Sequence, residues 1–243
     1  MPLKEEMERQ GNWLFRWRSY LPLALLPLLA WALVDAGFAR QTSAPWDLVS
    51  LGVASLGFLV RILTVGCVPA GTSGRNVARQ VAYQLNSTGI YSTVRHPLYL
   101  GNFFMATGVI LFLRSPWFTV VFALVYWMYY ERIMFAEEEY LRGRYRQAYV
   151  RWASRIPAII PSFRHYVPAV LPFSLRTVLR REYPGLLGLA TAFTALAAIR
   201  SVLSQGKLDP GPGWVFFFGT SVLLALVLRT LKHRTSYLSL AGR

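Results

Sequence analysis

Long apolar runs separated by polar connections are the main pattern along this chain of 243 residues. The runs lie at residues 21–39, 47–65, 98–113, 116–130, 185–203 and 214–228. A helix needs about 20 residues to cross the roughly 30 Å hydrocarbon core of a bilayer, and several runs are near or below that length. Such helices cross with little tilt, or where the membrane is locally thinner. The pattern predicts an all-α, polytopic membrane protein with about six transmembrane helices.

The connections between the runs are unequal in length. The third and fourth runs are separated only by a short turn around Arg114-Ser115-Pro116, so we expect them to form a tight helical hairpin. Two connections are much longer than the 2–8 residues typical between helices, namely 66–97 and 131–183. Within the second, residues 164–183 place apolar residues near helical spacing among arginines, a pattern that favours a segment lying on the membrane surface as much as a plain connector.

The first apolar run has a second interpretation as a signal peptide. Basic residues precede it, and Val34-Asp35-Ala36 loosely resembles a cleavage site. The polar lead-in of about 20 residues is long for a signal peptide. Pro22 and Pro27 also interrupt the run, so a membrane helix is favoured.

Composition and charge support the membrane interpretation. Hydrophobic residues make up 54% of the chain and charged residues only 15%, against roughly 45–50% and 25% in soluble domains. With a cytoplasmic N-terminus and six crossings, most of the 26 lysines and arginines fall on the inner side. The exceptions are Arg40, Arg114, Arg200 and Lys207. This is the asymmetry of the positive-inside rule, so the net charge of +15 requires no nucleic acid. Both termini and both long connections are predicted to be cytoplasmic.

The chain offers little for disulfide or metal chemistry. Cys67 is its only cysteine, which excludes a disulfide framework. His96, His165 and His233 are too scattered to indicate a metal cluster. No metal site is predicted.

The unusual polar residues lie in the two long connections. Arg95-His96-Pro97 opens the third apolar run, and Glu137-Glu138-Glu139 follows the fourth. Each feature alone has an ordinary explanation, since a proline often begins a helix and acidic residues often form a solvated face. Together they indicate a cytoplasmic polar site, because three adjacent carboxylates repel one another unless cations lie nearby.

The order of these residues resembles a known family. Residues 89–101 read Gly-Ile-Tyr-Ser-Thr-Val-Arg-His-Pro-Leu-Tyr-Leu-Gly. Downstream, Glu137-Glu138 is followed by Leu141, Tyr145 and Tyr149, then by Ile156-Pro157 and Ile160-Pro161. Both stretches resemble the signatures of the isoprenylcysteine carboxyl methyltransferase family, integral membrane enzymes that use S-adenosylmethionine and include phospholipid methyltransferases. The resemblance covers roughly residues 75–163, and the last two helices lie outside it.

The resemblance, taken together with the apolar runs, predicts four parts of the chain. They are two N-terminal helices (1–65), a methyltransferase core (66–163), an interfacial amphipathic segment (164–183) and two C-terminal helices (184–243). It also implies contacts to S-adenosylmethionine, with Asn76 as a weaker candidate. The main contacts would be Tyr83, Gln84, Leu85, Asn86, Tyr91, His96, Pro97, Leu98, Tyr99, Glu137 and Glu138.

These residue types suit that ligand. Tyrosines and a leucine can enclose an adenine, and Arg95 or His96 can face a carboxylate. Glu137 can face an ammonium group or hydrogen-bond a ribose. Pro97 begins a helix whose N-terminal N–H groups favour an anion.

The methyl acceptor is harder to assign. Family members place an arginine four residues before the first glutamate, where this chain has Ile133, and Arg132 is one step away, about 100° around a helix. Arg132 and Arg95 are the two residues predicted to act in catalysis, with Arg142, Arg144 and Arg151 as alternatives to Arg132. Arg146 also replaces the usual glycine. The expected acceptor is a carboxylate, phosphate or amine head of a lipid or prenylated molecule that enters from the bilayer.

Two other functions compete with methyl transfer. A membrane reductase of the sterol type would bind NADPH, and the arginines can contact its phosphate. A transporter would place charged residues in mid-membrane along a pathway. The spans contain few charged residues; Asp35, Arg61 and Arg200 lie near span ends, where we expect their charges to reach out to water.

Overall fold

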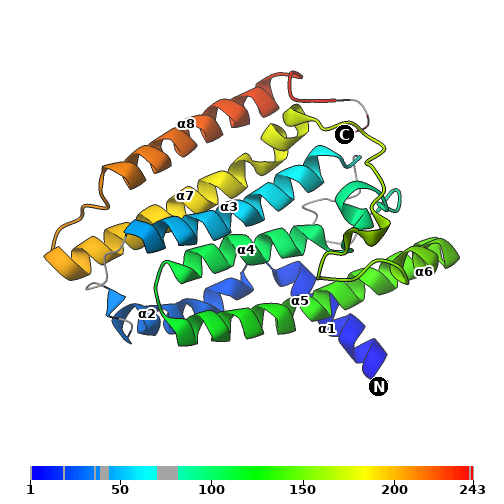
Figure 1. Cartoon of the computed structure of the whole chain (residues 1–243), viewed down its shortest axis with the longest axis horizontal. Helices are drawn as coiled ribbons and strands as arrows, with labels where there is room; N and C mark the ends of the chain where they lie inside the picture. Colours follow the sequence, from blue (N-terminus) through cyan, green and yellow to red (C-terminus); the bar gives the residue numbers. More distant parts are fainter. Residues whose placement is uncertain are drawn as a thin grey trace.

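The fold is a bundle of helices that run roughly along one common direction (Figure 1). The computed structural model describes residues 2–18, 20–35, 37–38, 44–69, 82–240 and 242. The long helices are α1 (Leu3–Trp17), α2 (Leu26–Asp35), α3 (Ala44–Gly66), α4 (Pro97–Leu111), α5 (Pro116–Tyr145), α6 (Gln147–Ala153), α7 (Leu175–Gln205) and α8 (Pro212–Arg234). Short 3₁₀ helices are η1 (Leu21–Leu25), η3 (Gly89–Ser92) and η4 (Phe163–His165). The described residues contain no strand, so the all-α prediction is confirmed.

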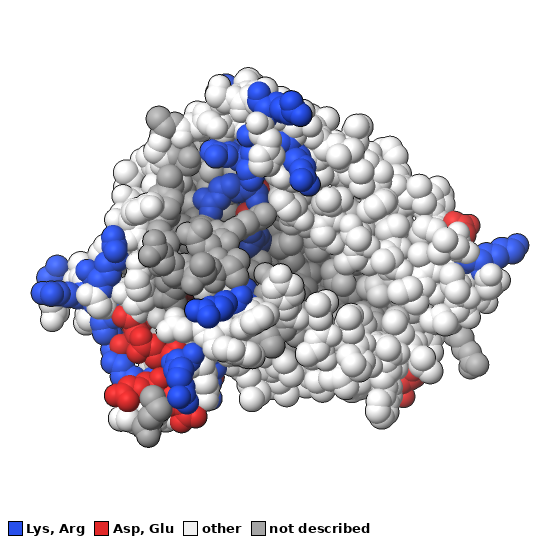
Figure 2. All heavy atoms as spheres, turned by 180° about the vertical axis from the view of Figure 1, so that it is seen from behind, with Lys and Arg blue, Asp and Glu red and all other residues white. Residues whose placement is uncertain are grey.

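Three helices are long and apolar enough to cross a membrane. They are α3, α7 and α8, with mean hydropathies of 2.1, 1.8 and 1.9 over their best windows. The apolar segment 23–35 and α4 are shorter, and α5 is apolar at its start and charged at its end. Figure 2 shows most of the visible charged side chains gathered over one end, a broad uncharged surface beside them, and a few charged side chains at the far end. The chain therefore has the composition of a membrane protein, while six crossings remain a prediction.

Small residues bring α3 and α4 together. A Cβ atom on Gly57 of α3 would collide with the backbone carbonyl of Gly101 in α4. One on Gly108 of α4 would lie 2.5 Å from the backbone nitrogen of Ala54. Close approach at small residues is a common way for membrane helices to pack, because lipid supplies no hydrophobic force between them. This contact sets the position of α4, whose first turn carries the Arg95-His96-Pro97 motif.

Two element boundaries differ from the sequence-based expectation. The helix α5 continues through Tyr145, so the acidic triplet lies on the same helix as the fourth apolar run. The helix α7 begins at Leu175, where the Ser174 side chain accepts a hydrogen bond from the Thr177 backbone nitrogen at 3.2 Å. Residues 175–183 are therefore the first turns of α7 and not a separate surface segment. Whether they lie at a membrane interface remains a prediction.

The expectation for two charged residues in the apolar runs was wrong. Arg200 does not reach out to water, because its Nη2 atom lies 2.9 Å from Asp47 Oδ2 and its side chain is 12% exposed. Arg61 is 13% exposed and bonds to Glu182 of α7. Sequence position alone missed these partners, because they come from helices far away in the chain.

The N-terminal helix α1 was not among the predicted elements. It packs along α5, where Gly11 lies directly against the backbone of Arg132. The Tyr129 hydroxyl of α5 also donates to the Leu14 carbonyl at 3.1 Å. The polar segment before the first apolar run is therefore a helix that packs against α5.

Candidate active site

The start of α4 is held by a neighbouring segment of the chain. The backbone N–H groups of Arg95 and His96 donate to the carbonyls of Pro157 and Ala158, at 2.9 and 3.3 Å. The Ser162 N–H donates in turn to the Thr93 carbonyl at 2.9 Å. These bonds fix the direction in which the Arg95 and His96 side chains leave the backbone. The Ile-Pro pairs of the downstream motif thus lie beside the first motif.

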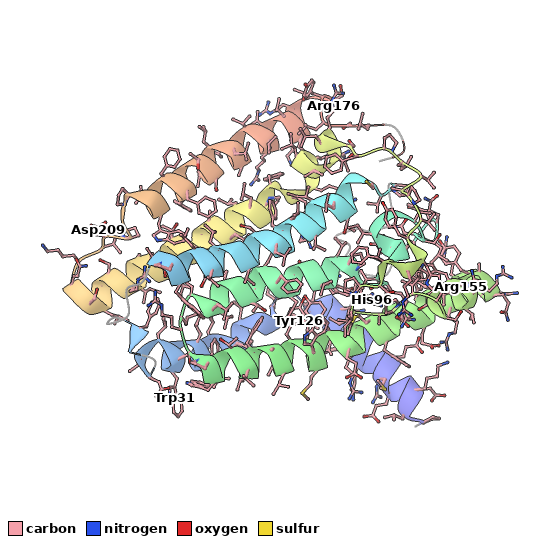
Figure 3. All side chains as sticks on the ribbon, viewed as in Figure 1. Trp31, His96, Tyr126, Arg155, Arg176 and Asp209 are labelled. Atoms are coloured by element: carbon pink, nitrogen blue, oxygen red, sulfur yellow. The ribbon has the colours of Figure 1, made fainter. Side chains whose placement is uncertain are left out.

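The two motifs meet in a polar cluster between the first turn of α4 and the last turns of α5. The His96 Nε2 atom lies 2.9 Å from Glu138 Oε1, and Arg95 Nη1 donates to Glu138 Oε2 at 3.2 Å. The Tyr99 hydroxyl donates to Glu137 Oε2 at 2.8 Å. Figure 3 labels His96 at this end of the molecule. The cluster of Arg95, His96, Tyr99, Glu137 and Glu138 is the candidate active site.

The three adjacent glutamates separate toward different partners. Glu138 binds Arg95 and His96, whereas Glu139 binds Lys4 of α1 at 2.7 Å and Arg142 at 3.0 Å. Glu137 has the most exposed side chain, at 34%, against 20% for Glu138 and 13% for Glu139. Of the three carboxylates, Glu137 is therefore the one most open to a ligand.

The electrostatics of the cluster follow from burial and from these partners. Burial opposes ionisation of Glu138, but the hydrogen bond and charge of His96 and the charge of Arg95 more than offset it and hold the Glu138 pKa below its usual value. Burial and the nearby Glu138 raise the pKa of Tyr149 above its usual value. At neutral pH the cluster thus presents an ionised Glu138 beside a protonated Tyr149.

Four of the predicted ligand-binding residues are in contact in this cluster, namely His96, Tyr99, Glu137 and Glu138. Pro97 begins α4, and the side chains of Tyr91 and Asn86 are hydrogen-bonded to each other. Leu85 and Leu98 are partly buried, whereas Gln84 is exposed and Tyr83 is 73% exposed. The contacts join Arg95, His96, Tyr99 and the two glutamates, but they do not bring Tyr83 or Gln84 to them. The ligand contacts themselves remain predictions.

Arg132, predicted to act on the acceptor, is not joined to the cluster. Among the described residues, no hydrogen bond or ion pair links its side chain to Glu137 or Glu138. Its backbone faces Gly11 of α1 instead. Residues 70–81, which include Asn76, lie outside the described part of the chain.

Sequence reasoning missed several aromatic residues that build the site. The Tyr126 hydroxyl donates to the Tyr99 carbonyl at 2.7 Å, and Tyr126 stacks on Tyr130 with ring centroids 4.2 Å apart. Trp152 donates from Nε1 to the Tyr91 carbonyl at 3.2 Å. The four-residue spacing of Tyr126 and Tyr130 was a signal, because such residues share one face of a helix. This spacing alone does not indicate a site, because aromatic residues near helix ends are also typical of membrane interfaces.

The fold and the cluster together define an all-helical, membrane-type protein with a polar site at one end of a helical hairpin. Residues 70–148 match the family model described as phospholipid methyltransferase. The chain is 33% identical over 149 residues to protein-S-isoprenylcysteine O-methyltransferase B of Arabidopsis thaliana. The aligned region covers 59% of this chain and 74% of that relative. The chain belongs to this family of isoprenylcysteine and phospholipid methyltransferases.

Two fungal relatives support the same assignment. The protein-S-isoprenylcysteine O-methyltransferase of Schizosaccharomyces pombe is 33% identical over 124 residues, covering 50% of this chain and 49% of the relative. The enzyme of the same name from Saccharomyces cerevisiae is 32% identical over 114 residues, covering 44% of this chain and 48% of the relative. The chain thus matches about half the length of each fungal relative. No solved structure matches it.

Proposed function

We propose that this protein transfers a methyl group from S-adenosylmethionine to the polar head of a lipid or prenylated acceptor. The observation that carries the proposal is the polar cluster of Arg95, His96, Tyr99, Glu137 and Glu138, built from two motifs at the end of the α4–α5 hairpin. Family membership supports methyl transfer as the reaction. The matched relatives are all named as methyltransferases, which does not favour the NADPH-dependent reductase considered above.

The residues of the cluster fit the chemical groups of this methyl donor. S-adenosylmethionine carries an ammonium group, a carboxylate, a ribose and an adenine. Glu137, with its exposed carboxylate, suits the ammonium group or the ribose. The Nε atom of Arg95 is buried and has no hydrogen-bond partner among the described residues. Buried polar atoms are nearly always partnered in folded proteins, so this atom suits a polar ligand.

Methyl transfer mainly requires that the donor and the acceptor are held in the right relative position. When bound, the donor would supply a methyl carbon on a positive sulfur. An acceptor oxygen could bond to that carbon as the carbon–sulfur bond breaks, with the electron pair of the broken bond left on sulfur. A carboxylate or phosphate acceptor needs no general base, whereas an ammonium acceptor must first lose a proton. The chain's contribution is to hold both molecules with the reacting atoms about 3–3.5 Å apart. His96 is buried and stacks on Tyr99, so this side of the cluster offers little room for water.

The acceptor is proposed to approach from the membrane. The relatives are named for action on isoprenylcysteine, an apolar chain with a carboxylate head. The three apolar helices of this chain suit an acceptor of that kind, and phospholipids share the same division into tail and head. In the proposed orientation, both termini and the site face the cytoplasm, where the donor is dissolved. Arg132 as the acceptor's cation remains a proposal from the family resemblance.

The function is tested by methyl transfer with the full chain in detergent. The protein is incubated with S-adenosylmethionine carrying a labelled methyl group and, separately, with a farnesylated cysteine, phospholipid vesicles and acetate. Labelled product with an apolar acceptor but not with acetate is the expected result. If NADPH but not S-adenosylmethionine raises the melting temperature, and no acceptor is labelled, the proposal is wrong.

A further inference from the structure

A second charged cluster lies inside the helix bundle. Arg61 of α3 and Glu182 of α7 form a two-point ion pair, with Nε–Oε2 and Nη2–Oε1 distances of 2.8 Å each. The Nη1 atom of Arg61 also donates to Asn102 Oδ1 of α4 at 2.7 Å. The Arg61 and Glu182 side chains are only 13% and 3% exposed. Three helices from distant parts of the chain are therefore joined at one guanidinium group.

Stability alone does not account for this pair. Burying two charges carries a large desolvation cost, and a well-packed apolar pair is often at least as stable. Ionisable residues within membrane helices are costly and usually have a function. What a two-point arginine–carboxylate pair does supply is a fixed geometry, because its parallel hydrogen bonds allow one relative orientation. Arg61 and Glu182 lie outside the residues 70–148 that match the family model.

Arg61 is connected to the candidate active site through α4. A Cβ atom on Gly101 would lie 2.6 Å from Arg61 Cγ, so this last glycine of the 89–101 motif leaves room for the arginine stem to cross α4. Asn102 follows Tyr99 by three residues and therefore lies one turn further along the same face. Tyr99 is the residue that binds Glu137. A shift of Arg61 would thus move the turn that carries Tyr99.

A second connection passes through Tyr91. Burial and Glu137 raise the pKa of Tyr91 above its usual value, and the Arg181 and Arg61 guanidinium groups oppose this rise. Both arginines therefore contribute to the electrostatic surroundings of the Tyr91 hydroxyl, one of the predicted ligand contacts. Arg181 precedes Glu182 in α7, so the pairing of Glu182 also places Arg181. The first turns of α7 are in this way part of the surroundings of the site.

We propose that Arg61 and Glu182 are positioning residues for methyl transfer. The helix α7 fixes Arg61 through Glu182, and Arg61 fixes the first turns of α4, which follow His96 and carry Tyr99. This inference rests on the proposed methyltransferase function. It gives α7 a task in the reaction, although this helix lies outside the motifs of the family. A misplacement of the reacting groups by about 1 Å can lower the rate about a hundredfold. We therefore expect loss of the Arg61–Glu182 pair to lower kcat.

The chain contains a matched control at the other end of the same helices. Asp47 of α3 binds Arg200 of α7 at 2.9 Å and Arg114 at 3.2 Å, and its side chain is 16% exposed. Asp47 and Glu182 are thus both enclosed carboxylates that join α3 to α7 through an arginine. They differ in place: Asp47 lies near the start of α3, whereas Glu182 binds near its end, on the side of the candidate site.

The test compares Glu182→Gln with Asp47→Asn in the labelled methyl transfer assay. For Glu182→Gln we expect kcat per folded molecule to fall about ten- to hundredfold, while the KM for the acceptor changes less than threefold. Glu182→Asp, which keeps the charge, should recover part of kcat. Asp47→Asn should lower the melting temperature but leave kcat per folded molecule unchanged. An unchanged kcat in Glu182→Gln, or an equal loss in Asp47→Asn, overturns the proposal.

A paired substitution separates positioning from simple loss of folding. Arg61→Met combined with Glu182→Leu removes both charges and leaves neither uncompensated. We expect this variant to melt within a few degrees of the unaltered chain and still to lose at least tenfold in kcat. A paired variant with full kcat would overturn the inference. The unaltered chain tells the two proposals apart, because a chain that labels no acceptor contradicts the methyltransferase function itself, whereas full activity in the paired variant contradicts only the inference.

Discussion

At the scale of single residues, the site depends on which partners the successive glutamates of α5 bind. Neighbouring residues on a helix point about 100° apart, so three adjacent carboxylates on α5 reach three sets of partners. Glu138 is engaged by His96 and Arg95, and Glu139 by Lys4 and Arg142. Glu137 accepts from the Tyr99 hydroxyl, lies 3.9 Å from His96 Nδ1 and is the most exposed of the three. Identical residue types thus have different surroundings, and we propose that Glu137 faces a ligand while Glu138 joins the two motifs.

The first prediction concerns binding of the methyl donor. His96→Ala and Glu137→Ala should each weaken S-adenosylmethionine binding about tenfold or more, because a hydrogen bond to a charged group contributes about 1.5–3 kcal/mol. Isothermal titration calorimetry on detergent-purified protein measures this. His165→Ala is the control, since the His165 side chain is exposed in η4. Equal donor affinity in all three variants would show that the site is wrongly placed.

The second prediction concerns the pH dependence of stability. The Glu138 pKa is lowered in the folded chain, so its ionised form stabilises the fold. This contribution is complete well above the unfolded pKa of about 4.3 and is lost as the pH falls through the lower folded pKa. Glu138→Gln should therefore melt about 2–4 °C lower at pH 7, for a loss of about 1 kcal/mol. The difference should shrink at pH 4; a constant difference at both pH values would contradict this account.

At the scale of elements, the sequence predicted helices well where apolar periodicity and start signals agreed. Pro97 and Pro116 begin α4 and α5, as their positions before apolar runs indicate. The helix α1 was missed because it is polar and is held by contact with α5, which no local pattern reports. The start of α7 was placed too late in the sequence. Ser174 caps the helix, whereas Pro184 lies inside it, at a position where a proline suggests that a helix begins.

The third prediction tests the contact between α1 and α5. A Cβ atom on Gly11 would collide with the Arg132 carbonyl and lie 2.8 Å from the Ala136 side chain. Gly11→Ala should therefore destabilise the chain by about 1–3 kcal/mol through overpacking. Gly143→Ala in α5 meets open space and should be neutral or slightly stabilising, because alanine favours helices by about 1 kcal/mol over glycine. Thermal melting in detergent compares the two. A similar melting temperature for both variants would mean that α1 does not pack on α5.

At the scale of the whole molecule, the site and both chain ends lie together. The N- and C-termini and His96 are at the same end of the bundle, and the loop with Asp209 is at the other (Figures 1 and 3). The motifs alone indicated which residues of α4 and α5 meet, because their chemistry and spacing are specific. Arg61 and Glu182 were beyond such reasoning, since their pairing depends on how α3, α4 and α7 assemble. The positions of charges along the chain predict the orientation, and this can be measured directly.

The fourth prediction is that the two ends of the bundle lie on opposite sides of the membrane. Arg155 lies at the site end and Asp209 in the loop between α7 and α8 (Figure 3). Of the three candidate spans, only α7 lies between them in the chain. In a Cys67→Ser background, Arg155→Cys and Asp209→Cys are each treated with a membrane-impermeant thiol reagent, in intact cells and in inside-out vesicles. Arg155→Cys should react only in inside-out vesicles and Asp209→Cys only in intact cells, because the arginine-rich end favours the anionic cytoplasmic face. Reaction of both from one side would mean that α7 does not cross, and the reverse pattern would place the site outside the cytoplasm.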